Sequence, residues 1–212
     1  QPLPEWISGY KNIATSATVT ASNTAEGSDV ALLNDQLIKY QDLDLVEEYE
    51  ANAGESKITL SWDSFKTVRA VMVYNSYDYE KTFVQISSME LEFLAANGST
   101  KKLSVGNIPF DWDWHFESDY EFMRPGGAAI AEFDEMPVKK ITITINTPKG
   151  AEGLAIGEIT VLGKDKACAG VSEFRQYGYE VTEYGSPIIV TESLNFGSVE
   201  GTGLVTEYGY DL

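Results

Sequence analysis

The stretch Ile141-Thr142-Ile143-Thr144-Ile145 decides the fold class, because apolar and polar residues alternate through it without a break. Successive side chains of a β-strand point to opposite faces of the sheet. The stretch therefore predicts a strand that buries its three isoleucines and turns its threonines outward. The same period of two occurs at 57–62 and 89–93, and the helical period is nearly absent from the chain.

Further β segments and turns surround these strands. Strands are predicted at 17–21, 67–75, 100–105, 128–133 and 156–162. Turn signals stand at Asn97-Gly98, Pro125-Gly126-Gly127 and Pro148-Lys149-Gly150. The one helix candidate is Asp29 to Leu37, where Ser28 or Asp29 could cap a short turn. Short strands about ten residues apart with turns between them predict an all-β protein, an antiparallel β-sandwich jelly roll over about 10–164.

The chain changes in character after Gly163-Lys164, where a stretch rich in Tyr, Glu and Gly begins. We therefore expect a sandwich over 1–164 and an extension, or the start of a linker, over 165–212. The five residues from Val181 recur from Val205, 24 positions later, which suggests two equivalent strands paired around the run from Pro187 to Thr191. The extension could pack on the sandwich as a small β unit, or it could belong to a neighbouring domain whose edge strands pair with a partner.

Composition and charge exclude several classes of function. Of the 212 residues, 43% are hydrophobic, which is enough for a core. The net charge of −18 repels phosphate backbones and anionic lipids, and no run of about 18 apolar residues could span a bilayer. The lone Cys168 makes no internal disulfide. A start at Gln1 without a signal segment suggests a trimmed or excised piece, and the composition suggests a secreted or cell-surface bacterial protein.

The most unusual stretch for function is Phe110-Asp111-Trp112-Asp113-Trp114-His115-Phe116, which we place in a long loop. Trp presents a flat apolar face that packs against a sugar ring, while carboxylates or His hydrogen-bond the hydroxyls. Trp112, Trp114 and His115 are therefore candidate glycan-binding residues. In the alternative interpretation, the two Trp plug one end of the sandwich and His115 is a structural imidazole.

Other loops add further candidates. A second aromatic loop, Tyr74 to Tyr79, offers Asn75, Tyr77 and Tyr79, and a third runs through Tyr40 and Tyr49. Tyr is also common at hairpins and sheet edges, so these side chains could be structural. Arg124 could donate to vicinal hydroxyls or pair with the nearby acids Glu121 and Asp119.

The sequence lacks the common motifs of enzyme active sites. The chain has no nucleophile elbow, zinc-protease helix or phosphate loop, and its single His removes most triads and metal hydrolases. Glu132-Phe133-Asp134-Glu135 is close to the carboxylate strand of jelly-roll laminarinases, but its last Glu comes one residue too early and would face the wrong side of a strand. We expect a non-catalytic protein.

Five segments, taken in order, resemble the galactose-binding-like (discoidin or coagulation factor V/VIII C-type) domain over about 10–164. They are Asn12-Ile13-Ala14 with Val19-Thr20-Ala21-Ser22, Ala31-Leu32-Leu33-Asn34-Asp35, Val71-Met72-Val73-Tyr74-Asn75-Ser76, Val138-Lys139-Lys140-Ile141-Thr142-Ile143, and Ile156-Gly157-Glu158-Ile159-Thr160-Val161-Leu162-Gly163.

The resemblance implies a structural calcium ion between the loop after the first strand and the last strand. Asp35 and Glu158 would supply side-chain oxygens, with a carbonyl near Leu32 or Gln36 beside them. Gln36 stands where the family's Asn-Asp-Gly turn has glycine, and the acidic stretch from Asp42 to Glu55 is distinctive of this chain.

The resemblance also implies a ligand site at one end of the sandwich, where the first-strand loop, the loop after Tyr74 and the loop near Arg124 meet. We expect a non-catalytic carbohydrate-binding module of a secreted or cell-surface polysaccharide-active protein, joined to other domains of a larger parent chain. So acidic a surface favours a neutral glycan or polysaccharide as partner. The alternative is a structural or protein-interaction β-sandwich with no sugar site.

Overall fold

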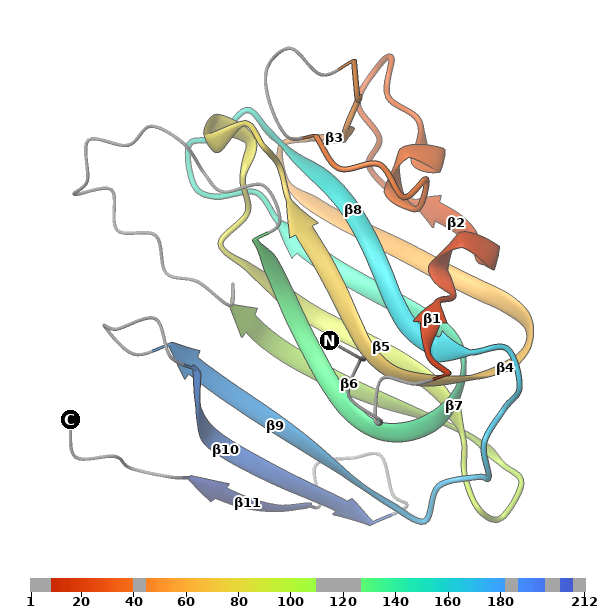
Figure 1. Cartoon of the computed structure of the whole chain (residues 1–212). Coiled ribbons are helices and arrows are strands. Elements are labelled where there is room, and N and C mark those ends of the chain that lie inside the picture. Colours follow the sequence, from red (N-terminus) through yellow and green to blue (C-terminus); the bar gives the residue numbers. More distant parts are fainter. Residues whose placement is uncertain (1–8, 40–44, 110–126, 182–186, 197–202, 208–212) are drawn as a thin grey trace, which may run out of the picture.

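The computed structural model describes residues 9–39, 45–109, 127–181, 187–196 and 203–207, with the backbone alone from Glu173 onward. Its elements are β1 (Lys11–Asn12), η1 (Ala14–Ser16), β2 (Thr18–Ala21), η2 (Val30–Leu33), β3 (Tyr49–Asn52), β4 (Glu55–Asn75), η3 (Tyr79–Lys81), β5 (Gln85–Leu94), β6 (Thr100–Pro109), β7 (Ala128–Asn146), β8 (Gly153–Lys164), β9 (Glu173–Val181), β10 (Pro187–Phe196) and β11 (Gly203–Glu207) (Figure 1). The all-β class is confirmed, since the three η elements are short 3-10 turns. In this described part of the chain, no helix has the length and hydropathy to cross a membrane.

Two long strands, β4 and β7, organise the sandwich. They pair antiparallel from Glu55↔Asn146 to Tyr74↔Ala128. The sequence predicted two separate strands within each of them, and this was wrong. In β4 the inward-facing phase changes between Trp62 and Thr67, where the register also shifts. The backbone stays extended through this change, so one strand serves both layers of the sandwich.

The two layers share one core. The first half of β4 pairs with β2 and with the second half of β7, which continues to β5 and β6. The second half of β4 pairs with β8, and β8 pairs with β1 and β3. Buried residues of both layers form a single hydrophobic cluster. Ile141, Ile143 and Ile145 are fully buried in it and Thr142 and Thr144 face the other side, as predicted.

Two turns predicted from the sequence are confirmed, and the predicted helix is not. The helix expected over 29–37 is only the 3-10 turn η2, although Asp29 caps it as expected by accepting from the Ala31 N–H at 2.9 Å. The Asn97-Gly98 turn is confirmed: it joins β5 to β6, Gly98 has φ +81°, and its N–H donates to the Ala95 carbonyl. The Pro148-Lys149-Gly150 turn is confirmed between β7 and β8 by the Ala151 N–H bond to the Pro148 carbonyl.

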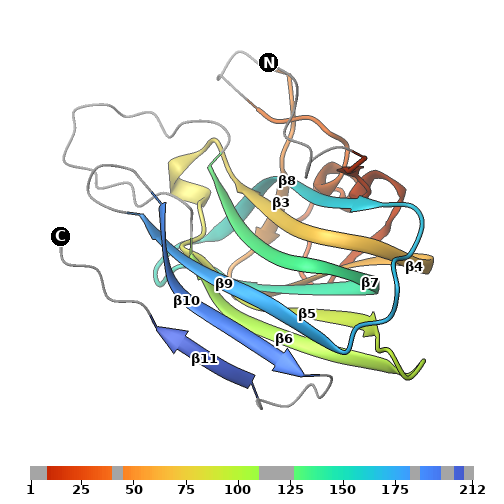
Figure 2. The ribbon, with the colours of Figure 1, turned by 60° about the horizontal axis from the view of Figure 1, so that its bottom comes forward.

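The strands of the C-terminal extension lie side by side at one edge of the molecule (Figures 1 and 2). Both β9 and β11 pair with β10, through Val181↔Pro187 and Val205↔Ser193 among others, so the two copies of the repeat begin on opposite sides of β10. Strand β9 meets β7 at Phe133↔Gln176, and Val171 bridges to Ala95. The extension therefore continues the strand network of the sandwich.

Candidate functional site

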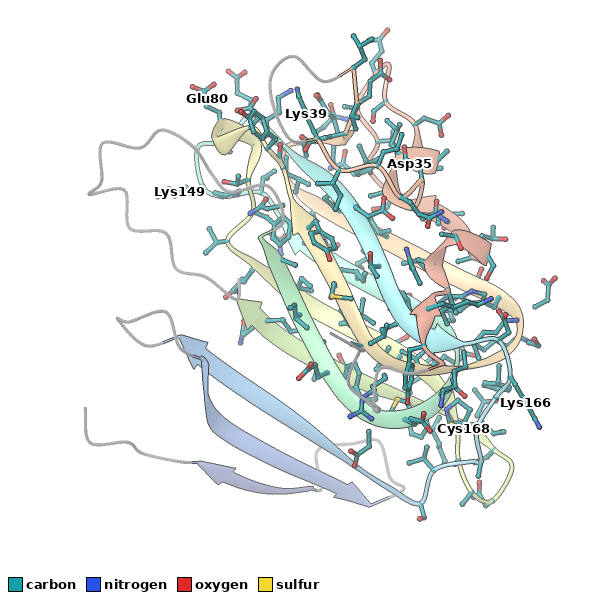
Figure 3. The ribbon with its side chains drawn as sticks, in the orientation of Figure 1. Asp35, Lys39, Glu80, Lys149, Lys166 and Cys168 are labelled. Carbon is teal, nitrogen blue, oxygen red and sulfur yellow. The ribbon has the colours of Figure 1, made fainter. Side chains whose placement is uncertain are left out.

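Three described segments meet at one end of the sandwich, which we call the loop end: residues 34–39, 45–48 and 76–84. Contacts between them are direct, since Lys39 Nζ lies 5.9 Å from the centre of the Tyr77 ring and Glu48 binds the Tyr77 main chain. Figure 3 shows Lys39 and Glu80 at this end, and Lys166 and Cys168 at the opposite end. The loop end is where the resemblance implies a ligand site.

Asn75 closes the loop between β4 and β5. Its Nδ2 donates to the Phe83 carbonyl (2.9 Å), and its Oδ1 accepts from the N–H groups of Phe83 (3.0 Å) and Ser76 (3.1 Å). The residue is only 9% exposed. Its amide therefore shapes the loop from within instead of presenting its polar atoms to solvent.

Tyr77 and Tyr79 lie in the loop that Asn75 closes. Tyr77 is half-buried next to Lys39. Tyr79 begins η3, and the Asp78 carboxylate caps that turn by accepting from the Glu80 N–H at 3.0 Å. The position of the Tyr79 side chain is outside the described part of the structure.

Trp112, Trp114, His115 and Arg124 fall in residues 110–126, outside the described residues. Both flanks of that segment are described, however, and both adjoin the loop end. On one side Pro109 pairs with Gln85, the residue after Val84. On the other, the Asn75 N–H donates to the Gly127 carbonyl at 3.0 Å. The residues on both sides of this segment, Pro109 and Gly127, therefore lie beside the loop that carries Tyr77.

Exposed apolar side chains are concentrated at the same end. In the described part of the chain, the large hydrophobic residues exposed to solvent are Leu37, Ile38, Leu45 and Val84. All four belong to the loop end. Contiguous exposed apolar patches often mark interaction sites, whereas single exposed hydrophobic residues are common on any surface.

The acidic stretch is bound to both neighbouring loops. Tyr49, expected in an aromatic loop, is instead fully buried in β3, and its hydroxyl donates to the Asn23 carbonyl at 2.9 Å. On the other side, Glu48 accepts two hydrogen bonds from Ser76 and Tyr77, and Glu50 pairs with Lys81 at 2.6 Å. The sequence analysis missed Glu48 and Glu50. The spacing of Tyr49 and Ala51 was the one local signal for β3.

Asp35 and Glu158, which the resemblance joined, lie together on the outer side of β8. Glu158 is 2% exposed, and its Oε2 accepts from the Gln36 N–H at 3.2 Å. Its Oε1 has no hydrogen-bond partner among the described residues. Asp35 Oδ1 accepts from the Leu37 N–H at 2.8 Å, which fixes the turn against Glu158.

The pKa of Glu158 is raised from 4.5 to about 8: burial is the main cause, the hydrogen bond from the Gln36 N–H opposes it, and the negative charge of Asp35 adds to the rise. A buried carboxylate oxygen without a partner costs free energy unless a proton or a cation compensates it. This site therefore suits a positive charge.

The carboxylate oxygens here are donors of the type that calcium takes, but this hard cation needs six to eight oxygens. Two carboxylates converge here, and the described residues contain no group of three or more His, Cys, Asp or Glu that could hold a metal. Main-chain carbonyls would have to complete the shell. Leu32, expected to contribute one, lies in η2 with its side chain packed against the core.

Gln36 adopts a backbone conformation that usually favours glycine. Its φ of 67° lies in the left-handed region, which costs a non-glycine residue about 1–2 kcal/mol. This conformation points the Gln36 N–H at Glu158.

No protein-family profile and no curated protein sequence matches the chain. Solved structures similar in fold include family 32 carbohydrate-binding modules and lectin modules, which are galactose-binding-like domains. The BgaA β-galactosidase of Streptococcus pneumoniae matches with 14% identity and a TM-score of 0.49, over 68% of this chain and 90% of that one. The family 32 module of C. perfringens NanJ, solved with galactose, matches with 14% identity and a TM-score of 0.46, over 72% and 98%. A fucose-binding module of S. pneumoniae matches with 18% identity and a TM-score of 0.45, over 73% and 96%.

Proposed function

We propose that this chain is a non-catalytic carbohydrate-binding module of a secreted or cell-surface bacterial polysaccharide-active protein. The observation that carries the proposal is the convergence at the loop end. The Tyr77 loop, the segment after Asp35 and both flanks of 110–126 meet there. Rigid strands below hold these loops, as sugar-binding sites on sandwiches require.

The ligand we propose is a neutral glycan. The carboxylates of Glu48, Glu50 and Asp78 lie at or beside the loop end, and Lys81, which pairs with Glu50 at 2.6 Å, offsets one of them. An anionic sugar would meet repulsion from these carboxylates. Shallow sites of this kind bind in the micromolar to millimolar range, about −8 to −4 kcal/mol.

Asp35 and Glu158, with main-chain carbonyls of the turn that follows Leu32, would hold a structural calcium ion. The ion would supply the positive charge that Glu158 otherwise obtains from a proton. Its role is to fix the 34–39 segment on β8, so that Lys39 and the residues beside it keep their place next to Tyr77.

Adding calcium is expected to raise the melting temperature, because an ion that binds only the folded state stabilises it by about 2.7 kcal/mol at 100 times its Kd. Scanning calorimetry with calcium and then with chelator tests this. The chelated protein should refold when calcium is restored. An unchanged melting temperature in millimolar calcium would reject the site.

Replacing Trp112 or Trp114 with alanine is expected to abolish measurable binding to a printed panel of neutral glycans while the melting temperature stays nearly constant. The reason is that an exposed indole face supplies most of the apolar contact with a sugar. Phe65→Ala is the control, since this aromatic lies in the middle of β4. If both Trp variants lose several degrees of stability and the parent protein binds nothing on the panel, the aromatics are core and the structural interpretation replaces this one.

A further inference from the structure

The loop over residues 76–84, which carries Tyr77, is anchored by the carboxylate of Glu48 from the acidic stretch. Ser76 Oγ–H donates to Glu48 Oε2 at 2.5 Å, and the Tyr77 N–H donates to Glu48 Oε1 at 2.9 Å. The Asp78 N–H in turn donates to Ser76 Oγ at 2.9 Å. One side chain thus determines the course of three consecutive residues of the loop.

Glu48 itself is held firmly. The next residue, Tyr49, is fully buried and begins β3, which pairs with β8 through Tyr49↔Ile156. A side chain attached to a paired strand is a more rigid anchor than one on a free loop. The carboxylate therefore holds the loop in a fixed position relative to the sheet.

The space for this carboxylate depends on Gly157. At this position β8 carries one extra residue opposite Tyr74 and Asn75. A Cβ on Gly157 would lie 3.0 Å from the Asn75 carbonyl oxygen and 3.5 Å from Glu48 Oε1. The glycine allows β8, the end of β4 and Glu48 to approach one another, directly beside Glu158.

A second contact from the same stretch ties the far side of the loop. Glu50 pairs with Lys81 at 2.6 Å, and both side chains are about 40% exposed or more. Exposed ion pairs contribute little, whereas charge-assisted hydrogen bonds to a half-buried carboxylate are stronger. Glu48 is therefore the main tie.

We propose that Glu48 is a positioning residue for glycan binding: by accepting from the Ser76 hydroxyl and the Tyr77 N–H, it holds the loop in the conformation in which Tyr77 faces the ligand. This inference rests on the proposed function. The acidic stretch then serves to orient the binding loop, and the residues that touch sugar lie elsewhere.

The test compares Glu48→Ala and Glu48→Gln with Glu47→Ala, a change at the adjacent exposed carboxylate. In Glu48→Ala we expect amide hydrogen exchange at Tyr77 and Asp78 to accelerate about tenfold or more, because the variant loses one charge-assisted hydrogen bond to the main chain. Affinity for immobilised galactose- and fucose-bearing neutral glycans should fall by a similar factor. Glu48→Gln keeps one acceptor and should fall between Glu48→Ala and the parent. The melting temperature and the calcium response should stay near those of the parent.

Two results would overturn the inference: equal exchange at Tyr77 in Glu48→Ala and Glu47→Ala, or faster exchange with unchanged glycan affinity. If the parent binds no glycan while exchange at Tyr77 still responds to Glu48→Ala, the proposed function fails and the hold of Glu48 on the loop stands. Should Glu48→Ala not fold, Ser76→Ala removes one of the two donors and is judged by the same exchange and affinity measurements.

Discussion

Ile143→Ala is expected to lower the free energy of unfolding by about 2–5 kcal/mol. Ile143 is fully buried and lies in β7 between Ile58 of β4 and Met89 of β5. Truncation removes apolar contacts on both sides and leaves a cavity in the centre of a layer. Urea denaturation monitored by Trp fluorescence measures the change.

Two neighbouring variants calibrate this result. Ile143→Val should cost about 0.5–1.5 kcal/mol, because it removes one methylene. Thr144→Ala, on the opposite face of the same strand, should stay within about 0.5 kcal/mol. A loss at Thr144 as large as that at Ile143 would contradict the assignment of the inner face.

In calcium-free buffer, Glu158→Gln is expected to be more stable than the parent above about pH 5, with a gap that widens up to pH 8. The folded-state pKa of Glu158 is raised to about 8, chiefly by burial. Between 4.5 and 8 the folded protein therefore keeps a proton that the unfolded chain has released, and the stability of the parent falls as the pH rises. The neutral amide escapes this loss, which reaches at most about 5 kcal/mol at pH 8.

Calcium should reverse the order of the two proteins, since it binds the ionised Glu158 of the parent and has no carboxylate to bind in the variant. Urea unfolding from pH 5 to 8.5, with and without calcium, gives both comparisons. Glu152→Gln is the control, because Glu152 is exposed. If the free energy of unfolding without calcium changes with pH in the same way for the parent and Glu158→Gln, burial does not disfavour the ionised form of Glu158.

The sequence predicted the fold well where alternation is strict and less well where it slips. The isoleucines of β7 were assigned correctly, because a period of two leaves no other face for them. The continuity of β4 was missed, because Asp63 to Lys66 interrupts the pattern while the backbone remains extended. Strand β3 was missed because Tyr49 stands among acids, and only its pairing with β8 shows that it is buried.

One part of the candidate site could be predicted from the family resemblance, and the rest depends on contacts that only the three-dimensional structure shows. Asp35 and Glu158 are far apart in the chain, and only the order of family-like segments suggested that they meet. Asn75 was recognised as notable, but its internal hydrogen bonds to Phe83 depend on a loop conformation that no local pattern encodes. Glu48 could not be predicted, because its partners Ser76 and Tyr77 come from a different strand end.

The pairing of β4 with β7 also determines when the chain can fold. Residues 55–75 pair with residues 128–146, which follow much later in the chain. Among the described residues between them, the locally paired unit is the β5–β6 hairpin. Contacts so distant in sequence slow folding, typically to milliseconds or longer. During synthesis the first half of the chain therefore emerges from the ribosome with Leu60, Val71 and Val73 still uncovered, for several seconds at about 5–20 residues per second. Its high content of acidic residues would oppose self-association of this unfinished chain until β7 arrives.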